Sequence, residues 1–85
     1  MEIKNVKKDK SVWSVDVDGI SIRIEIKLTT AKLYIDNKLQ DVSIITYGGE
    51  CLTGKLPNNK DVKARVVGEL KSHCYIFVDN ELVLE

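Results

Sequence analysis

Residues 20–28 (ISIRIEIKL) constrain the fold more than any other part of the chain, because apolar and polar side chains alternate there without exception. A period of two places the four isoleucines and Leu28 on one face of a β-strand, whereas an amphipathic helix needs apolar residues three and four positions apart. Asp18-Gly19 precedes this stretch, and residues 12–17 before it also alternate. Asp-Gly between two alternating segments indicates a tight hairpin, so the sequence predicts a pair of antiparallel strands here.

A second pattern occurs twice. Residues 33–39 (LYIDNKL) and 76–82 (IFVDNEL) each consist of a β-rich apolar run, Asp-Asn, a charged residue and Leu. Asp and Asn tolerate the left-handed backbone conformation that tight hairpin turns require. An alternating segment also lies ahead of each copy, at residues 20–26 and 62–67. These parallels predict two pseudo-repeated halves, each built from antiparallel strands.

The rest of the chain continues the same pattern, with turn residues between short β-rich segments and no stretch that favours a helix. The sequence predicts roughly seven or eight short strands and an all-β fold, an antiparallel β-sandwich or a small barrel, of which we favour the sandwich. A chain of 85 residues fits a single domain spanning residues 1–85. The residues that we expect in its core are Val15, Ile22, Ile24, Ile26, Cys74 and Val78.

The length of the Asp-Asn turns decides whether a second apolar face exists. A two-residue turn puts Tyr34 on the same face as Leu39, and a three-residue loop instead puts Ile35 with Leu39 on a single core face. Both alternatives are open from the sequence. In the last hairpin the two-residue turn would likewise pair Phe77 with Leu82 and Tyr75 with Leu84. The resulting interaction surface would be formed by Tyr34, Leu39, Tyr75, Phe77, Leu82 and Leu84.

Several segments resemble the Fas apoptotic inhibitory molecule family. Trp13 followed by Asp18-Gly19 and Arg23-Ile24 resembles the opening hairpin of one of its β-domains, and residues 56–64 and 72–82 resemble that domain's last strands. The resemblance extends from Trp13 to Leu82. It implies a sandwich of two antiparallel sheets, no catalytic residues and no cofactor. Animal members of the family are described as apoptosis inhibitors that act through protein contacts.

The residues themselves predict no enzyme. His73 and Cys74 are adjacent, so in a strand their side chains point to opposite faces and cannot form a thiol–imidazole pair. One histidine and two cysteines are too few for a histidine-rich or thiolate metal site. Asp18, Asp36 and Asp79 lie in predicted turns, where their side chains bond nearby backbone. We therefore predict no catalytic residue, no cofactor and no metal site.

The charge and the hydropathy of the chain limit the classes of partner that we expect. Thirteen basic and 13 acidic residues give a net charge of +0, which argues against nucleic acid as a partner. No apolar run reaches the length of a membrane span or a signal peptide, so we expect a cytoplasmic protein without a membrane partner. The predicted function is a small β-domain that acts by protein–protein interaction or self-association, with a homo-oligomer or another protein as the partner. The alternative function is a small nucleic-acid-binding β-barrel.

Overall fold

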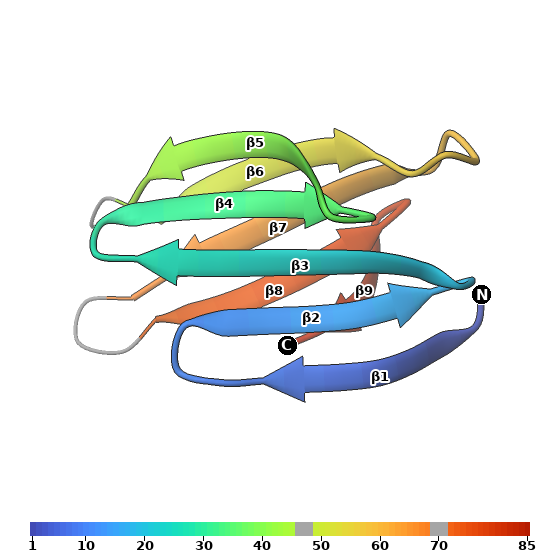
Figure 1. Ribbon diagram of the computed structural model, residues 1–85, viewed down its shortest axis with the longest axis horizontal. Helices are drawn as coiled ribbons and strands as arrows, with labels where there is room; N and C mark the ends of the chain where they lie inside the picture. The colour runs from blue at the N-terminus through green and yellow to red at the C-terminus, as the bar shows by residue number, and fades with distance from the viewer. Residues whose placement is uncertain (46–48, 69–71) are drawn as a thin grey trace.

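Two antiparallel sheets make up the protein in a computed structural model, which describes residues 1–45, 49–68 and 72–85. Figure 1 shows the two sheets facing each other, and they are not closed into a barrel. The first sheet contains, in spatial order, β1 (Ile3–Lys8), β2 (Val12–Val17), β3 (Ile20–Lys27), β4 (Thr30–Ile35) and β5 (Lys38–Ile44). The second contains β6 (Glu50–Lys55), β7 (Asp61–Val67), β8 (His73–Val78) and β9 (Glu81–Leu84), again in spatial order.

The predicted all-β class is therefore confirmed, and the arrangement is sandwich-like. The described residues form nine strands, so the predicted strand number was too low. The additional strand is β1, which pairs with β2 although its sequence, IKNVKK, does not alternate. All six of its residues are exposed, so no burial pattern marks them as a strand in the sequence.

The core lies between the sheets and follows the alternation of the strands. Five of the six predicted core residues are buried, and the sixth, Ile26, is half-buried and packs against the core. The prediction for Leu28 was wrong, since its side chain is 93% exposed. Lys27 pairs with Thr30, so Leu28 is the first residue of a turn, where its φ is 56°. Alternation of apolar residues therefore does not predict burial for a residue that lies in the turn after the strand.

The Asp-Asn turns contain two residues each. Ile35 pairs with Lys38, and the intervening Asp36 and Asn37 have φ values of 50° and 63°. Positive φ at both central residues is the conformation that matches the twist of a two-residue hairpin. The β8–β9 turn has the same geometry at Asp79 and Asn80, with φ values of 48° and 66°. The two-residue alternative is thus the one that the protein adopts.

Both hairpins also contain a β-bulge just beyond the turn. In the last hairpin Phe77 pairs with Leu82, but Ile76 pairs with Leu84, so Val83 is the extra residue. The bulge turns Leu84 into the core, where it is only 3% exposed. The predicted pairing of Leu84 with Tyr75 was therefore wrong, because it assumed a regular ladder.

The first hairpin is bulged in the same way. Tyr34 pairs with Leu39, but Leu33 pairs with Asp41, so Gln40 is the extra residue. Beyond the bulge, Asp41 and Ser43 share the inner face with their partners Leu33 and Ala31. The inner and outer sides of β5 are consequently set by Gln40, a residue whose type gives no indication of a bulge.

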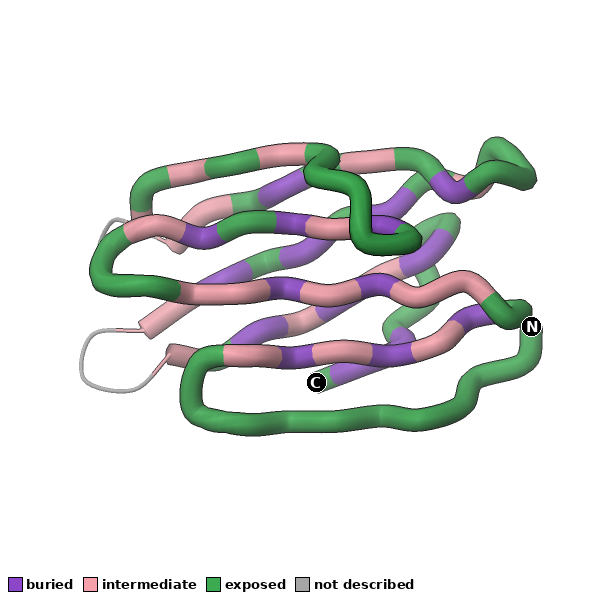
Figure 2. Tube along the Cα trace, viewed as in Figure 1, coloured by how far each residue is buried: buried purple, intermediate pink, exposed green. Residues whose placement is uncertain are grey.

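The two lateral edges of the sandwich differ in how the end strands of the sheets are arranged. On one side β5 and β6 meet in a close seam, where the Asp41 carboxylate accepts a hydrogen bond from the Thr53 N–H at 2.9 Å. A Cβ atom on Gly54 would lie 3.1 Å from both Gln40 Cβ and Ile35 Cδ1, so β6 approaches its neighbours closely here. On the other side lie β1 and β9, and β1 is exposed along its whole length (Figure 2).

Candidate interaction surfaces

The six residues of the predicted interaction surface do not come together. Tyr34 and Leu39 pair on the outer face of the first sheet. Phe77 and Leu82 pair on the outer face of the second sheet, and Tyr75 lies on that same face because it is two positions from Phe77. Leu84 is in the core. The structure thus separates the predicted surface into two outer faces and one buried residue.

Tyr34 is half-buried because Arg23 covers its ring. The Arg23 guanidinium carbon lies 4.5 Å from the centre of the ring, a cation–π arrangement. Arg23 Nε donates to Glu25 Oε2 at 2.7 Å, and its Nη1 donates to Asn37 Oδ1 at 2.6 Å. The aromatic ring of the first sheet and its cation are therefore both engaged with neighbours in the same sheet.

The outer side of β5 carries an apolar row, here called the β5 stripe and defined as Leu39, Val42 and Ile44. Their side chains are 52%, 46% and 66% exposed. Val42 and Ile44 lie opposite Lys32 and Thr30, on the outer face, while the inward positions between them are the polar Asp41 and Ser43. β5 therefore reverses the polarity of the other strands that form the sandwich.

The seam explains the polar residues on the inner side of β5. The Asp41 carboxylate accepts a hydrogen bond from the Thr53 N–H of β6, and Ser43 Oγ donates to Glu50 Oε2 at 3.4 Å. The inward positions thus bind the edge of the other sheet instead of filling the core. No comparable interaction accounts for the β5 stripe within the described residues.

A second surface, here called the β7–β8 face, lies on the outside of the second sheet and is defined as Lys63, Arg65, Tyr75 and Phe77. Lys63 pairs directly with Phe77, and Arg65 pairs directly with Tyr75. Directly opposed residues in an antiparallel ladder have Cβ atoms about 4.5–5.5 Å apart. Two cations and two aromatic rings consequently form one block of four on adjacent strands.

The sequence indicated these surfaces only in part. Tyr75 and Phe77 belonged to the predicted surface, but Lys63 and Arg65 did not, because their pairing with the aromatic residues depends on the β7–β8 register. Val42 and Ile44 were missed as well. Their alternation is visible in the sequence, but the Gln40 bulge decides which way they face.

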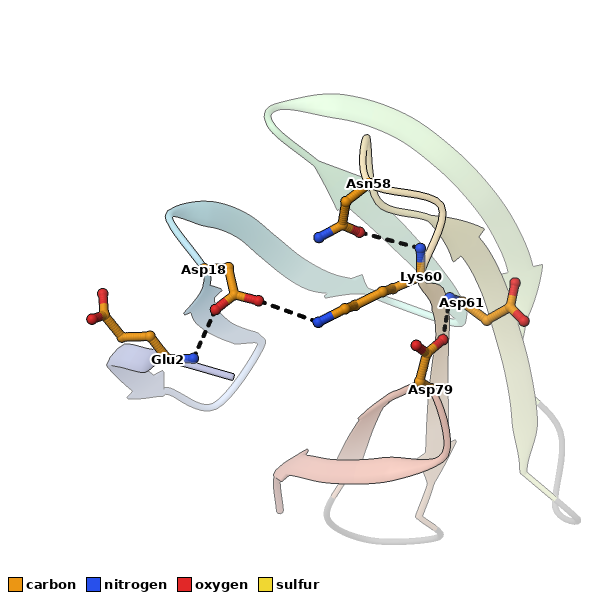
Figure 3. Close-up of polar contacts among 6 residues, drawn as sticks. All are labelled: Glu2, Asp18, Asn58, Lys60, Asp61 and Asp79. Carbon is orange, nitrogen blue, oxygen red and sulfur yellow. Dashed lines mark hydrogen bonds and ion pairs between the residues drawn. The ribbon is translucent and has the colours of Figure 1, made fainter.

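Polar residues at one end of the sandwich tie strand ends together (Figure 3). Asp18 Oδ1 accepts a hydrogen bond from the Glu2 N–H at 2.7 Å, and Asp18 Oδ2 lies 3.4 Å from Lys60 Nζ. The Lys60 contact joins the β2–β3 turn of the first sheet to the loop before β7 in the second. The hydrogen bond from Glu2 lowers the pKa of Asp18 below its ordinary value, partial desolvation opposes that shift, and Lys60 assists it. These contacts hold the fold together at this end.

No reactive group is assembled among the described residues. Cys74 is buried, which raises the pKa of its thiol to about 12, and the neighbouring His73 is exposed on the opposite face of β8. Within residues 1–45, 49–68 and 72–85, no three His, Cys, Asp or Glu side chains are grouped so that they could hold a metal ion. The same residues contain no helix long and apolar enough to span a bilayer.

Comparison with known proteins found no family model, no curated protein and no solved structure that matches this chain. The resemblance to the Fas apoptotic inhibitory molecule family therefore stays a prediction from the sequence.

Proposed function

We propose that this protein is a non-catalytic β-domain that acts through protein contact, with the β5 stripe as its contact surface. The observation that carries the proposal is the reversed polarity of β5, whose apolar residues Leu39, Val42 and Ile44 face outward. Clustered exposed apolar side chains of this kind typically mark interaction sites.

Covering the β5 stripe with a partner surface is energetically favourable. Removing apolar surface from water contributes about 25 cal/mol per Å². Three branched side chains on one strand face offer a continuous area for that gain, and Leu39, at the hairpin end, lies beside Tyr34. β-Branched Val42 and Ile44 lose little side-chain freedom on burial, which reduces the entropic cost of an interface.

The predicted family and the repeat belong to the same proposal. Membership of the Fas apoptotic inhibitory molecule family would agree with a role in protein contact, because its animal members are described as acting that way. The matching turn and bulge in the β4–β5 and β8–β9 hairpins support the interpretation of the chain as two pseudo-repeated halves. A cytoplasmic location and the absence of catalysis complete the proposed function.

Self-association is the form of contact to test first, because it needs no knowledge of a partner. Sedimentation velocity from micromolar to millimolar concentration should show a concentration-dependent dimer. The double variant Leu39→Lys/Ile44→Lys should remain monomeric over that range, since two charges would be buried in the interface.

A matched control uses exposed apolar residues elsewhere. Ile3→Lys/Val6→Lys introduces the same charge on β1, where both side chains are exposed, and should leave the dimer unchanged. Phe77→Lys tests the other sheet. If Phe77→Lys abolishes the dimer and Leu39→Lys/Ile44→Lys does not, the contact surface lies on the second sheet and the β5 assignment is wrong. A strict monomer at millimolar concentration would exclude self-association.

A further inference from the structure

The outer face of each sheet carries a cation and an aromatic ring at equivalent positions, but the contacts of the two cations differ. Lys63 and Phe77 hold the positions in the second sheet that Arg23 and Tyr34 hold in the first, as the shared two-residue turns and cross-strand pairs establish. In the first sheet the cation is stacked on the ring and bound by Glu25. In the second sheet the position of Glu25 is taken by Arg65, so a second cation replaces the carboxylate.

The cations of the β7–β8 face are thus left without that neutralising contact. Among the described residues, no ion pair involves Lys63 or Arg65, and no cation–π contact involves Tyr75 or Phe77. Neither sheet nor any other described element covers this face, because the other sheet packs on the opposite side. Two exposed cations and two half-buried rings therefore lie on the same outer surface.

Although the net charge of the chain is +0, its acidic and basic side chains are unevenly distributed over the structure. Asp18 and Asp79 lie in turns, where their carboxylates accept backbone N–H groups at strand ends. On the outer face of the second sheet, Asp61 is the acidic residue of β7, and it lies 3.7 Å from Lys55. Among the residues that the structure describes, Lys63 and Arg65 have no ion pair of their own beside it. Since exposed charges act over about 10 Å at ordinary ionic strength, a ligand at this face meets a locally positive surface.

We propose that the β7–β8 face binds single-stranded nucleic acid, with two bases stacked on Tyr75 and Phe77 and the backbone phosphates bound by Lys63 and Arg65. Aromatic side chains on an open antiparallel sheet stack bases, and adjacent cations neutralise the phosphates that connect them. Tyr75 and Phe77 are two positions apart on one strand, about 6.6–6.8 Å, a spacing that a flexible single strand can match by spreading neighbouring bases. This activity goes beyond the proposed protein contact, which uses the other sheet.

Fluorescence anisotropy with a labelled oligothymidine of about ten nucleotides tests the site directly. With few contacts and about 50 mM salt, we expect a Kd on the order of 10–100 μM. Neutralisation of two phosphates predicts a slope of about −1.4 in a plot of log affinity against log salt concentration. Absence of binding at 0.5 mM protein and low salt would overturn the proposal.

Paired variants distinguish the face from non-specific attraction. Phe77→Leu keeps an apolar side chain but removes the ring, and should weaken binding roughly 5- to 100-fold. Tyr34→Leu, the equivalent change in the first sheet, should have no effect. Lys63→Glu/Arg65→Glu should weaken binding at least about tenfold, whereas Lys27→Glu/Lys32→Glu, with the same change in net charge, should leave affinity within about threefold.

A competitor separates base stacking from charge alone. Polyphosphate, which carries the charges without the bases, should displace the oligonucleotide poorly, and so should a duplex whose bases are already stacked. Equal displacement by polyphosphate, or an unaltered affinity in Phe77→Leu, would show a simple charge patch and overturn the proposal. Circular dichroism of each variant confirms that the sheets are intact before its affinity is compared.

Discussion

Asp79 and Asp61 are joined by two hydrogen bonds where the β7–β8 ladder ends. The Asp79 N–H donates to the Asp61 carbonyl at 2.8 Å, and the Asp79 Oδ1 accepts a hydrogen bond from the Asp61 N–H, also at 2.8 Å. In a regular antiparallel pair both acceptors are main-chain carbonyls. Here the side chain of the first turn residue takes the place of one carbonyl. The ladder is therefore extended by one more pair of hydrogen bonds at a position where the backbone already forms the turn.

The first sheet contains the same arrangement twice. The Asp36 N–H donates to the Ser21 carbonyl at 2.9 Å, and Asp36 Oδ1 accepts from the Ser21 N–H at 3.3 Å. Asp18 makes the equivalent pair with Glu2, at 2.8 Å and 2.7 Å. Aspartate at the first turn position therefore supports the left-handed backbone of the turn and fastens the neighbouring strand.

Replacing Asp79 with Ala should lower the free energy of unfolding by about 1–3 kcal/mol, because the Asp61 N–H loses its charged acceptor and Ala tolerates positive φ poorly. Urea denaturation measures the change. The control is Glu81→Ala in the same hairpin, an exposed position where we expect less than about 0.5 kcal/mol. Equal effects of the two substitutions would contradict the assigned role.

Acid should weaken the contribution of Asp18. Its pKa is lower in the folded protein than the ordinary value of 3.8, so the folded state binds fewer protons than the unfolded state as the pH falls through this range. The stabilisation is present above that ordinary value and is lost as the pH falls through the lower folded value. The stability difference between the parent and Asp18→Asn, followed by urea midpoints from pH 5 down to about pH 2, should shrink. A difference that stays constant over this range would contradict the prediction.

Two isoleucine truncations should separate the core from the β5 stripe. Ile24→Ala removes a fully buried side chain and should cost on the order of 2–5 kcal/mol. Ile44→Ala makes the same change in the same sheet at a side chain that is 66% exposed, and should cost less than about 0.5 kcal/mol. Denaturant midpoints at low micromolar protein avoid any contribution from association. Similar midpoints for both variants would mean that the faces are wrongly assigned.

Thiol labelling should distinguish the two cysteines. Cys51 is exposed, whereas Cys74 is buried and its pKa is raised to about 12, so it holds almost no reactive thiolate at neutral pH. A maleimide reagent should modify Cys51 in the folded protein and reach Cys74 only in urea, as mass spectrometry would show. Cys51→Ser should then remain unlabelled until it unfolds. Rapid labelling of folded Cys51→Ser would contradict the burial of Cys74.

The strands that alternate and are covered on one face could be predicted from the sequence, as Ile22 and Ile24 illustrate. Burial selects apolar residues at every second position, and that selection is what the pattern records. β1 has no buried face, so nothing comparable marks Ile3 and Val6. The limit of prediction here is the absence of burial.

The bulges mark a second limit. Gln40 and Val83 are ordinary strand residues, yet each shifts its ladder by one position and thereby sends Leu84 inward and Ile44 outward. Because a one-residue shift reverses every side chain beyond it, the composition of a candidate surface can be predicted while its location is wrong. Leu84 shows this, since the bulge moves it from the predicted surface into the core. Tyr34 and Phe77 lie on opposite sides of the sandwich for a different reason, because they belong to different sheets.

The sequential order of the strands has a practical consequence. Residues 3–44 supply the first sheet and residues 50–84 the second, so every ladder among the described residues forms within one continuous stretch. A break between the stretches would remove a covalent link but no strand pairing. Neither sheet can bury its apolar face alone. Burial of these two faces against each other would therefore favour the association of two separately produced fragments. The protein is therefore suited to fragment complementation, in which reassembly reports that two fused proteins have met.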